Sequence, residues 1–190
     1  QPMRSISRSP SDTGIPVAVP DGTTGVGGAI HYNIDVAQYT DTLHPSLGPT
    51  TLRGYKPQNA LGGTTTQRHL GGIIVANKGA PVQITFNNNL AGTHPIPIDQ
   101  TIMGANMGEN RTCTHLHGGL VPWISDGGPN AWFAPANNYG PSVPITTYNT
   151  AFGKTLADGQ AEYYYPNNQS ARMLWYHDHT LGITRMNAYI

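Results

Sequence analysis

The sequence is poor in charge, in cysteine and in long apolar runs. Only 11% of its 190 residues are charged, against about 25% in ordinary globular domains. Ten basic residues balance ten acidic ones and no basic run occurs, so a nucleic acid is not expected as a partner. No apolar run approaches the ~18–20 residues that a membrane helix needs. A single cysteine, Cys113, excludes a disulfide within the chain and leaves the compartment open.

Turn-forming residues are abundant instead. The chain contains 23 Gly and 16 Pro. Many turn residues with little charge are typical of all-β proteins, in which short strands alternate with loops. Residues 1–28 show no hydrophobic period and read as an irregular N-terminal arm. We therefore expect an arm at residues 1–28 and one all-β domain at residues 29–190.

Alternating apolar residues predict where the strands lie. Strands are expected at Ala29–Thr40, at two places within Gly71–Leu90, within residues 112–119, in a hairpin over Ala161–His179 and in residues 182–190. The proline-punctuated residues 43–58 are expected to form an extended crossing, and no helix is strongly signalled. About seven short strands joined by long loops favour a Greek-key barrel or sandwich.

Four of the eight histidines stand in two His-x-His pairs, in "THLHGG" and "WYHDHT". Residues i and i+2 of a strand point to the same face, about 6.6–7 Å apart. His115 and His117 would therefore present two imidazoles to one side, and so would His177 and His179. If the two strands are neighbours, four imidazoles converge on a pocket that suits copper, zinc, iron or nickel. One pair alone could be coincidence, whereas two pairs in strand contexts favour a metal site.

At these motifs the sequence resembles the multicopper oxidases, in particular the branch of spore-coat laccases and bilirubin oxidases. "HLHGGLVPWISDGGPNAWF" is similar to the family's first copper motif, and "LWYHDHTLGITRMNAY" to its second. "DVAQYTDTLHP" and "TLHPSLGPTTLRGY" also resemble that branch, so the likeness runs from about residue 29 onward. The resemblance implies a cupredoxin-like Greek-key β-barrel that agrees with the predicted strands.

The resemblance also implies a role for each paired histidine. His115 would bind the type 2 copper, His117 and His177 one type 3 copper, and His179 the other. In the family these three coppers form a trinuclear cluster held by eight histidines, of which this chain would supply four. The other four, and the type 1 copper that receives electrons from the substrate, depend on His-x-x-His-x-His and His-Cys-His motifs.

Neither of those motifs occurs in this chain. The expected partner is therefore a C-terminal portion of the same oxidase, present as a second chain or as a cleaved fragment. Dioxygen and a small reducing substrate, such as a phenol, a bilin or a metal ion, are the other expected partners. The family and two glycosylation sequons, at Asn110 and Asn168, suggest a secreted, periplasmic or cell-surface protein, with a spore coat as one setting.

Three further residues lie within the motifs. The resemblance gives Asp126 a role in delivering protons to reduced oxygen, a task that suits a carboxylate linked to water. The alternative for Asp126 is a plain Asp-Gly turn. Asp178 lies between two ligands, so alternation points it away from the metal, where it would fix the strand by a hydrogen bond or by pairing with Arg185. Cys113 is two residues before His115, so on a strand it could face the same side as the site. A buried, inert thiol is nevertheless the better interpretation.

The remaining histidines and the aromatic residues have simpler explanations. The histidines without a partner at ligand spacing, expected at the surface or hydrogen-bonded, are His31, His44, His69 and His94. The aromatic residues that flank the motifs, expected to pack around the site, are Trp123, Trp132, Trp175 and Tyr176. Two rival functions stay open: a non-catalytic copper-binding barrel, and a zinc hydrolase that uses His-x-His with a distant carboxylate.

Overall fold

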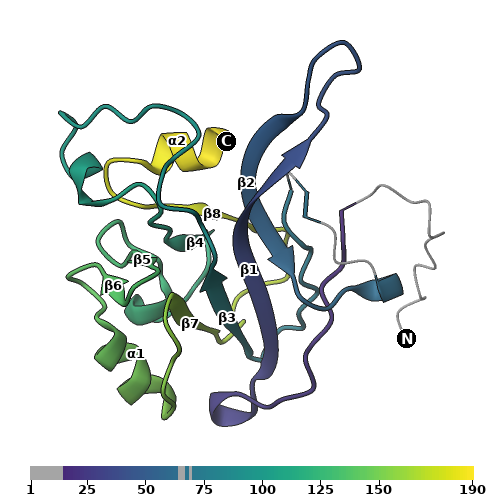
Figure 1. The fold of residues 1–190 in the computed structure, drawn as a ribbon. Helices are drawn as coiled ribbons and strands as arrows, with labels where there is room; N and C mark the ends of the chain where they lie inside the picture. The colour runs from purple at the N-terminus through teal and green to yellow at the C-terminus, as the bar shows by residue number, and fades with distance from the viewer. Residues whose placement is uncertain (1–14, 64–66, 69) are drawn as a thin grey trace.

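The computed structural model describes residues 15–63, 67–68 and 70–190. Its strands are β1 (Ile30–Asp41), β2 (Thr50–Pro57), β3 (Val82–Asn88), β4 (Thr114–His117), β5 (Phe133–Ala134), β6 (Asn138–Tyr139), β7 (Gln160–Tyr165) and β8 (Trp175–Asp178). Two short α-helices, α1 (Ile145–Phe152) and α2 (Thr184–Tyr189), and the 3-10 turns η1 (Val26–Gly28), η2 (Leu61–Gly63), η3 (Ala105–Met107) and η4 (Trp123–Ser125) complete it (Figure 1). The described residues are mostly β, as the sequence predicted.

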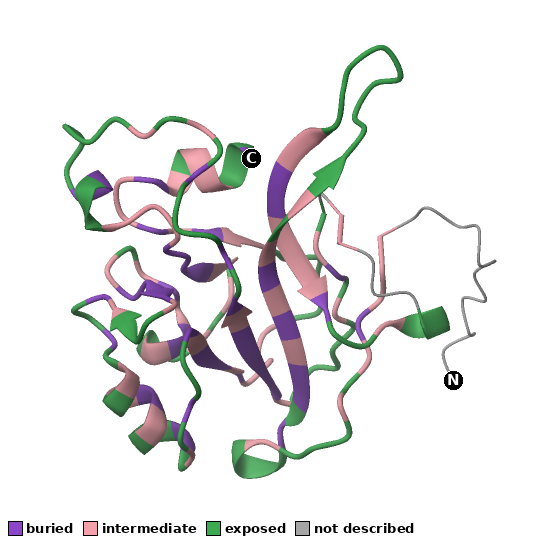
Figure 2. Ribbon diagram, viewed as in Figure 1, coloured by how far each residue is buried: buried purple, intermediate pink, exposed green. Residues whose placement is uncertain are grey.

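The main sheet has four strands in the order β2-β1-β3-β7. β1 pairs antiparallel with β2 and parallel with β3, and β3 pairs antiparallel with β7. Alternate residues of β1, among them Tyr32, Ile34 and Val36, are buried, and Figure 2 shows the resulting banding along the strand. β3 and β7 are buried along nearly their whole length, whereas β1 is buried mainly at alternate residues. Loops and α1 lie beside β3 and β7 and shield them from solvent.

Aromatic rings fill much of the core. Phe86 of β3 meets Tyr163 of β7 edge to face at 5.3 Å between ring centroids, and Tyr148 of α1 stacks on Tyr163 at 6.2 Å. Such arrangements suit the electrostatics of aromatic rings and add to the stabilisation from buried area. α1 is thereby packed against β7, with Tyr148 fully buried.

A second, two-stranded sheet carries the histidine motifs. β4 pairs antiparallel with β8, so that His115 lies opposite His177 and Thr114 opposite Asp178. The inward face of this pair rests on the main sheet through Leu116 and Tyr176, and Tyr176 meets Tyr55 of β2 edge to face at 5.1 Å. The predicted strand within residues 112–119 is confirmed.

Two predicted elements were wrong. Residues 161–179 do not form a hairpin, because β7 pairs with β3 whereas β8 pairs with β4. Asn167 does adopt a turn conformation (φ 55°), but its carbonyl accepts from Gly79 in the turn before β3. The last stretch forms helix α2 instead of a strand. The helix itself has no buried residue, and the buried residues that flank it, Ile183 and Ile190, lie seven positions apart, which is about two helical turns.

Two other segments differ in part from the prediction. The proline-punctuated crossing contains β2, which returns antiparallel to β1. Of the two strands expected within Gly71–Leu90, only β3 forms, and Ile73 makes an isolated bridge with Val17. Residues 15–28 of the predicted arm contain no strand; they form isolated bridges and the turn η1, and the rest of the arm lies outside the described residues.

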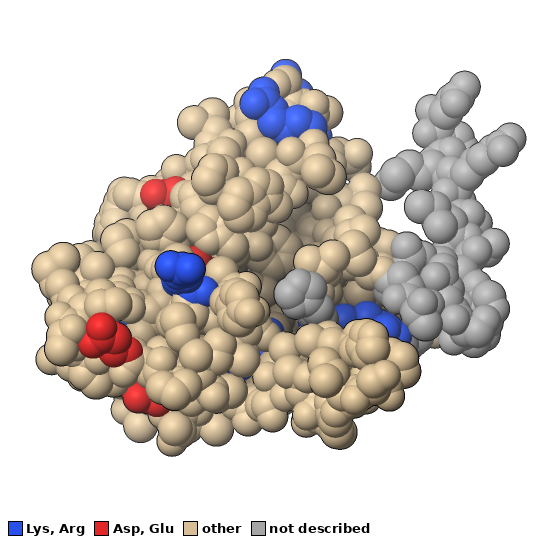
Figure 3. Space-filling view, turned by 90° about the horizontal axis from the view of Figure 1, so that it is seen from above, with Lys and Arg blue, Asp and Glu red and all other residues tan. Residues whose placement is uncertain are grey.

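The surface agrees with the composition. On the face shown in Figure 3, charged side chains are few and scattered, and the surface is hollowed near its centre. Within the described part of the chain, no helix has both the length and the apolar character needed to cross a bilayer.

Candidate metal centre

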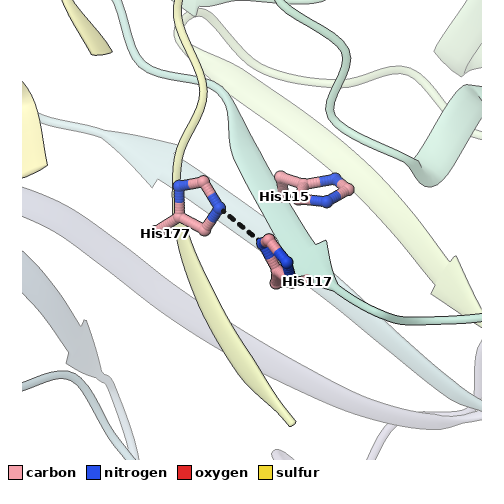
Figure 4. Close-up of side chains that lie close together, drawn as sticks. All are labelled: His115, His117 and His177. Atoms are coloured by element: carbon pink, nitrogen blue, oxygen red, sulfur yellow. Dashed lines mark hydrogen bonds between the residues drawn. The ribbon is translucent and has the colours of Figure 1, made fainter. Parts of the chain in front are cut away.

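Three imidazoles meet on the outer face of the β4–β8 pair. His115 and His117 project from β4 and His177 from β8, because strand alternation and the register place all three on the same side. One ring nitrogen from each lies within 4.8 Å of those of the other two (Figure 4). The predicted neighbourhood of the two motifs is therefore observed. His115 and His177 are half-buried and His117 is exposed.

Hydrogen bonds decide which nitrogen each ring can offer to a metal. His115 Nδ1 donates to the carbonyl of Asp126 at 2.5 Å, and His177 Nδ1 donates to the carbonyl of Asp178 at 2.7 Å. Each of these rings keeps Nε2 with a free lone pair, the arrangement by which backbone carbonyls orient ligand imidazoles in metal sites. These are the anchoring partners that the sequence could not name.

The contact between His117 and His177 has the spacing of a shared ion. His117 Nδ1 lies 3.4 Å from His177 Nε2. Two nitrogens bound to one metal ion at about 2.0–2.1 Å in tetrahedral geometry are separated by roughly 3.4 Å. The residues therefore fit a transition metal, with His117 offering Nδ1 and His177 offering Nε2.

His179 lies beside this group of three but outside it. It follows β8, its backbone N–H donates to the carbonyl of Cys113 at 2.7 Å, and its ring centroid is 5.2 Å from that of His115. Its Nδ1 is buried and has no hydrogen-bond partner among the described residues. A buried ring nitrogen of this kind needs a partner, so His179 as a ligand stays a prediction that its surroundings favour.

The neutral form of the ligands is favoured electrostatically. Burial lowers the pKa of His177 below its ordinary value, and the neighbouring rings of His115, His179 and His117 lower it further, against the hydrogen bond to the Asp178 carbonyl. Only a neutral imidazole can bind a metal. The cluster thus holds His177 in the state that metal binding requires.

The aromatic residues around the site differ in exposure. Trp175 stacks on His117 at 4.4 Å and on His177 at 4.6 Å between ring centroids, yet more than half of its surface is exposed. Trp132 is buried, as packing predicts, whereas Trp123 is even more exposed than Trp175. Packing within the described residues explains Trp132 and Tyr176 but not Trp123 or Trp175.

Asp126 lies in a turn beside His115, and its backbone and its side chain face the same ring. It ends η4 and precedes Gly127, whose φ of 67° completes an Asp-Gly turn. Its carbonyl anchors His115, while its carboxylate Oδ1 lies 3.5 Å from His115 Nδ1 with half of the side chain exposed. A carboxylate at that position can exchange protons with solvent beside the imidazole cluster. The turn is observed, and the proton-transfer role stays a prediction.

Asp178 and Cys113 lie behind the site. Asp178 is buried and accepts hydrogen bonds from the Cys113 N–H, from Thr112 Oγ1 and from the N–H and hydroxyl of Thr180, each at 3.0 Å. It therefore fixes the strand pair as predicted, by hydrogen bonds and not through Arg185, which is exposed. Burial raises the pKa of the Cys113 thiol well above its ordinary range, so the thiol is inert.

Comparisons with known proteins agree on one family. No model of a known protein family matches the sequence. The laccase of Bacillus subtilis (strain 168) is 35% identical over 163 residues, which are 84% of this chain and 27% of that protein. A laccase of Haloferax volcanii is 32% identical over 184 residues, 91% of this chain and 27% of that protein. The chain contains a multicopper oxidase domain.

The fold comparison extends this result to the architecture. A multicopper oxidase from Pediococcus acidilactici matches with a TM-score of 0.57 at 20% identity, covering 93% of this chain and 26% of that one. At this identity the likeness concerns the fold alone, and it confirms the cupredoxin-like β architecture. The chain spans about a quarter of the length of these relatives. The multicopper oxidase domain implies copper as the metal and an oxidoreductase family.

The other described histidines are not part of this group of three. His44 is exposed and His94 is buried with its Nε2 lacking a partner among the described residues, while His69 lies outside those residues. His31 is buried between two carboxylates. That cluster was not foreseen from the sequence, because its members come from segments far apart in the chain.

The structure also contains a cavity that the sequence did not reveal. It measures about 830 Å³ and lies between the main sheet, β8 and residues 70–78. Its lining includes Ile84, Phe86 and Leu116, and it reaches the metal centre only at His177. Sequence reasoning missed it because its walls come from segments that lie far apart in the chain.

Proposed function

We propose that this chain forms part of the oxygen-reducing copper centre of a laccase-like oxidase. The observation that carries the proposal is the meeting of three imidazole donor nitrogens within 4.8 Å on paired strands of a multicopper oxidase domain. Nitrogen-rich donor sets suit copper, and the names of the relatives point to the same metal.

The proposed division of ligands follows the family resemblance. His115 would bind a type 2 copper, His117 and His177 would share one type 3 copper, and His179 would bind the other. The 3.4 Å spacing between His117 Nδ1 and His177 Nε2 supports the shared ion. The remaining ligands, and the type 1 copper with its substrate pocket, would come from a C-terminal portion of the oxidase.

Each residue of this chain has a definite task in that function. Bound copper would supply the one-electron redox chemistry that couples substrate oxidation to the reduction of dioxygen to water. The carbonyls of Asp126 and Asp178 hold His115 and His177 in the tautomer that presents Nε2. The Asp126 carboxylate, open to solvent, would pass protons toward the site, since four are consumed for each dioxygen.

The proposed substrates and setting come from the resemblance. A phenol, a bilin or a metal ion would give up single electrons, and the protein would act outside the cytoplasm, in the periplasm or on the cell surface. Three relatives are named laccases, which favours a phenolic substrate.

Metal content and intact mass of the native protein test the proposal together. We expect copper, a partner polypeptide or segment with a His-Cys-His motif, and near-ultraviolet absorption that the His177→Ala variant loses. The control is His44→Ala, which removes an exposed histidine that is not part of the cluster. A stoichiometric zinc content, or copper that survives His177→Ala unchanged, contradicts the proposal.

A further inference from the structure

The arm turn, defined here as residues 20–28, is an exposed loop folded back onto β1 and β3. Most of its residues are exposed. Two of its inward contacts are made through side chains of the sheet: Asp21 contacts His31 of β1, and the Val26 N–H donates to Gln83 of β3 at 2.7 Å. Asp21 makes two further bonds to β1: its backbone N–H donates to the carbonyl of His31 at 3.1 Å, and Asn33 Nδ2 donates to its Oδ2 at 2.5 Å. The bond from Gly25 N–H to Ala29 is local. The turn is therefore tied to the sheet mainly at two points, Asp21 and Val26.

His31 is enclosed by carboxylates on both sides of its ring. Nδ1 lies 2.7 Å from Asp21 Oδ2, and Nε2 lies 3.1 Å from Glu162 Oε1 on β7. His31 is 6% exposed and Glu162 is fully buried. Nε2 also lies 3.0 Å from Thr85 Oγ1, whose hydroxyl donates to Glu162 Oε2 at 2.8 Å and therefore accepts from the ring. An ionised carboxylate only accepts hydrogen bonds, and a ring donates from both nitrogens only as the imidazolium. The geometry therefore favours a protonated His31.

Three ionisable groups face the His31 ring or its partners. Asp21 comes from the arm turn, Glu162 from β7, and Lys154 from the segment after α1, with its Nζ 2.5 Å from Glu162 Oε2. Two cations and two carboxylates thus balance while His31 is charged. After loss of the ring proton, one negative charge is left uncompensated in a largely buried cluster, which is costly.

The second tether of the arm turn depends on the same carboxylate. Gln83 accepts from the Val26 N–H through Oε1 and donates from Nε2 to Glu162 Oε1 at 2.6 Å. Glu162 is fixed in a strand that is paired with β3, whereas Asp21 lies on the loop. Asp21 is therefore the partner that can move away when the cluster loses its balance.

We propose that the arm turn is a pH-operated flap, closed while His31 carries both ring protons and released when it loses one. Burial alone would lower the pKa of His31, but the hydrogen bonds to Glu162 and Asp21 raise it above the ordinary value of 6.5. At pH values below 6.5, His31 is protonated in either state of the flap, and the closed flap has its full stabilisation. This stabilisation is lost as the pH rises through the raised pKa of His31. Alkaline conditions release the flap.

Hydrogen exchange tests the flap at individual amides. The Asp21 N–H donates to the carbonyl of His31 at 3.1 Å and the Val26 N–H donates to Gln83, so both amides report contact of the turn with the sheet. After correction for intrinsic exchange, protection of these amides should fall from about pH 5.5 to about pH 9, by about tenfold for each unit that closure raises the His31 pKa. Constant protection over this range overturns the proposal.

Three variants separate the flap from general unfolding. His31→Gln cannot titrate, so its protection should not change with pH, whereas the exposed-histidine control His44→Gln should behave as the parent protein does. Asp21→Asn leaves the sheet intact and should move the midpoint of release to lower pH, which keeps the test decisive if His31→Gln does not fold. An unchanged midpoint in Asp21→Asn, or an unchanged pH profile in a folded His31→Gln, overturns the proposal.

Discussion

At the scale of single residues, Asp126 has its backbone and its side chain next to the same ring, so anchoring of His115 and proton transfer depend on different atoms. Its backbone carbonyl anchors His115, and its carboxylate, half exposed, lies 3.5 Å from the same ring nitrogen. Replacing the carboxylate by an amide preserves the carbonyl and the turn but removes the group that can carry a proton. The two tasks can therefore be measured apart in one variant.

We expect Asp126→Asn to lower the rate of oxygen reduction in the copper-loaded oxidase by roughly 10²-fold or more, the usual contribution of a general acid or base. Copper content should be unchanged, because the ligands and their carbonyl anchors remain. Oxygen uptake and metal analysis on the same sample check this. Asp99→Asn, a change in an exposed turn held by Thr101, serves as control and should retain full turnover. A parallel loss of copper would assign Asp126 to structure alone.

Cys113 gives a second prediction, on reactivity. Its thiol is fully buried, donates to the Gly128 carbonyl at 3.1 Å, and has a pKa raised by burial. Because the thiolate is the reactive form, thiol reagents should label the folded protein only as fast as it opens. Labelling followed against denaturant concentration should track the unfolding transition. Rapid labelling in native buffer would show that the thiol is accessible and the interpretation wrong.

At the scale of elements, the sequence predicted what depends on local alternation. β1, β3 and β4 were foreseen, and the His-x-His spacing alone placed His115 and His117 on one face. The sequence did not predict which strands pair, because no local signal distinguishes a hairpin over Ala161–His179 from two strands in different sheets. The helix α2 was missed because it is only six residues long and has no buried residue, so the segment carries no apolar period that distinguishes a helix from a strand.

The same limit explains the parts of the sites that were missed. The carbonyl partners of His115 and His177 are backbone atoms, which leave no trace in the choice of residue. The charged cluster at His31 joins residues 21, 31, 154 and 162, which are distant in the chain and are brought together only by the sheet. Sequence reasoning expected a surface or hydrogen-bonded His31, and the structure shows a buried ring whose partners include two carboxylates.

One element, the turn after η4, is set by a glycine. Gly127 has φ 67°, and a Cβ placed there would lie 1.9 Å from the carbonyl oxygen of Thr114 in β4. Gly127→Ala should therefore lower the free energy of unfolding by about 2 kcal/mol or more, from backbone strain and from displacement of β4. Chemical denaturation measures the change.

The matched control for this prediction is Gly79→Ala. Gly79 has a similar φ of 76° but open space around its Cβ position. Gly79→Ala should lower the free energy of unfolding only by the cost of the backbone conformation, about 1 kcal/mol. Equal losses in the two variants would mean that the contact with β4 contributes nothing.

At the scale of the whole molecule, the histidine cluster lies at the surface of the described residues. His117 is exposed, and Trp175, stacked on it, is 54% exposed, so one side of the site is open within those residues. A metal held from one side by three or four imidazoles still joins β4 to β8, two strands whose motifs are sixty residues apart. Binding of the metal to the folded state alone must therefore stabilise the domain.

Removing the metal should lower the melting temperature of the protein. A ligand present at a hundred times its dissociation constant stabilises the native state by about 2.7 kcal/mol, which for a chain of this size corresponds to roughly 5–10 °C. Scanning calorimetry before and after treatment with a chelator, followed by return of copper, measures the shift. His177→Ala should abolish the shift because it removes the ligand contributed by β8, whereas His44→Ala should keep it. A shift of equal size in both variants would place the stabilising ion elsewhere than between β4 and β8.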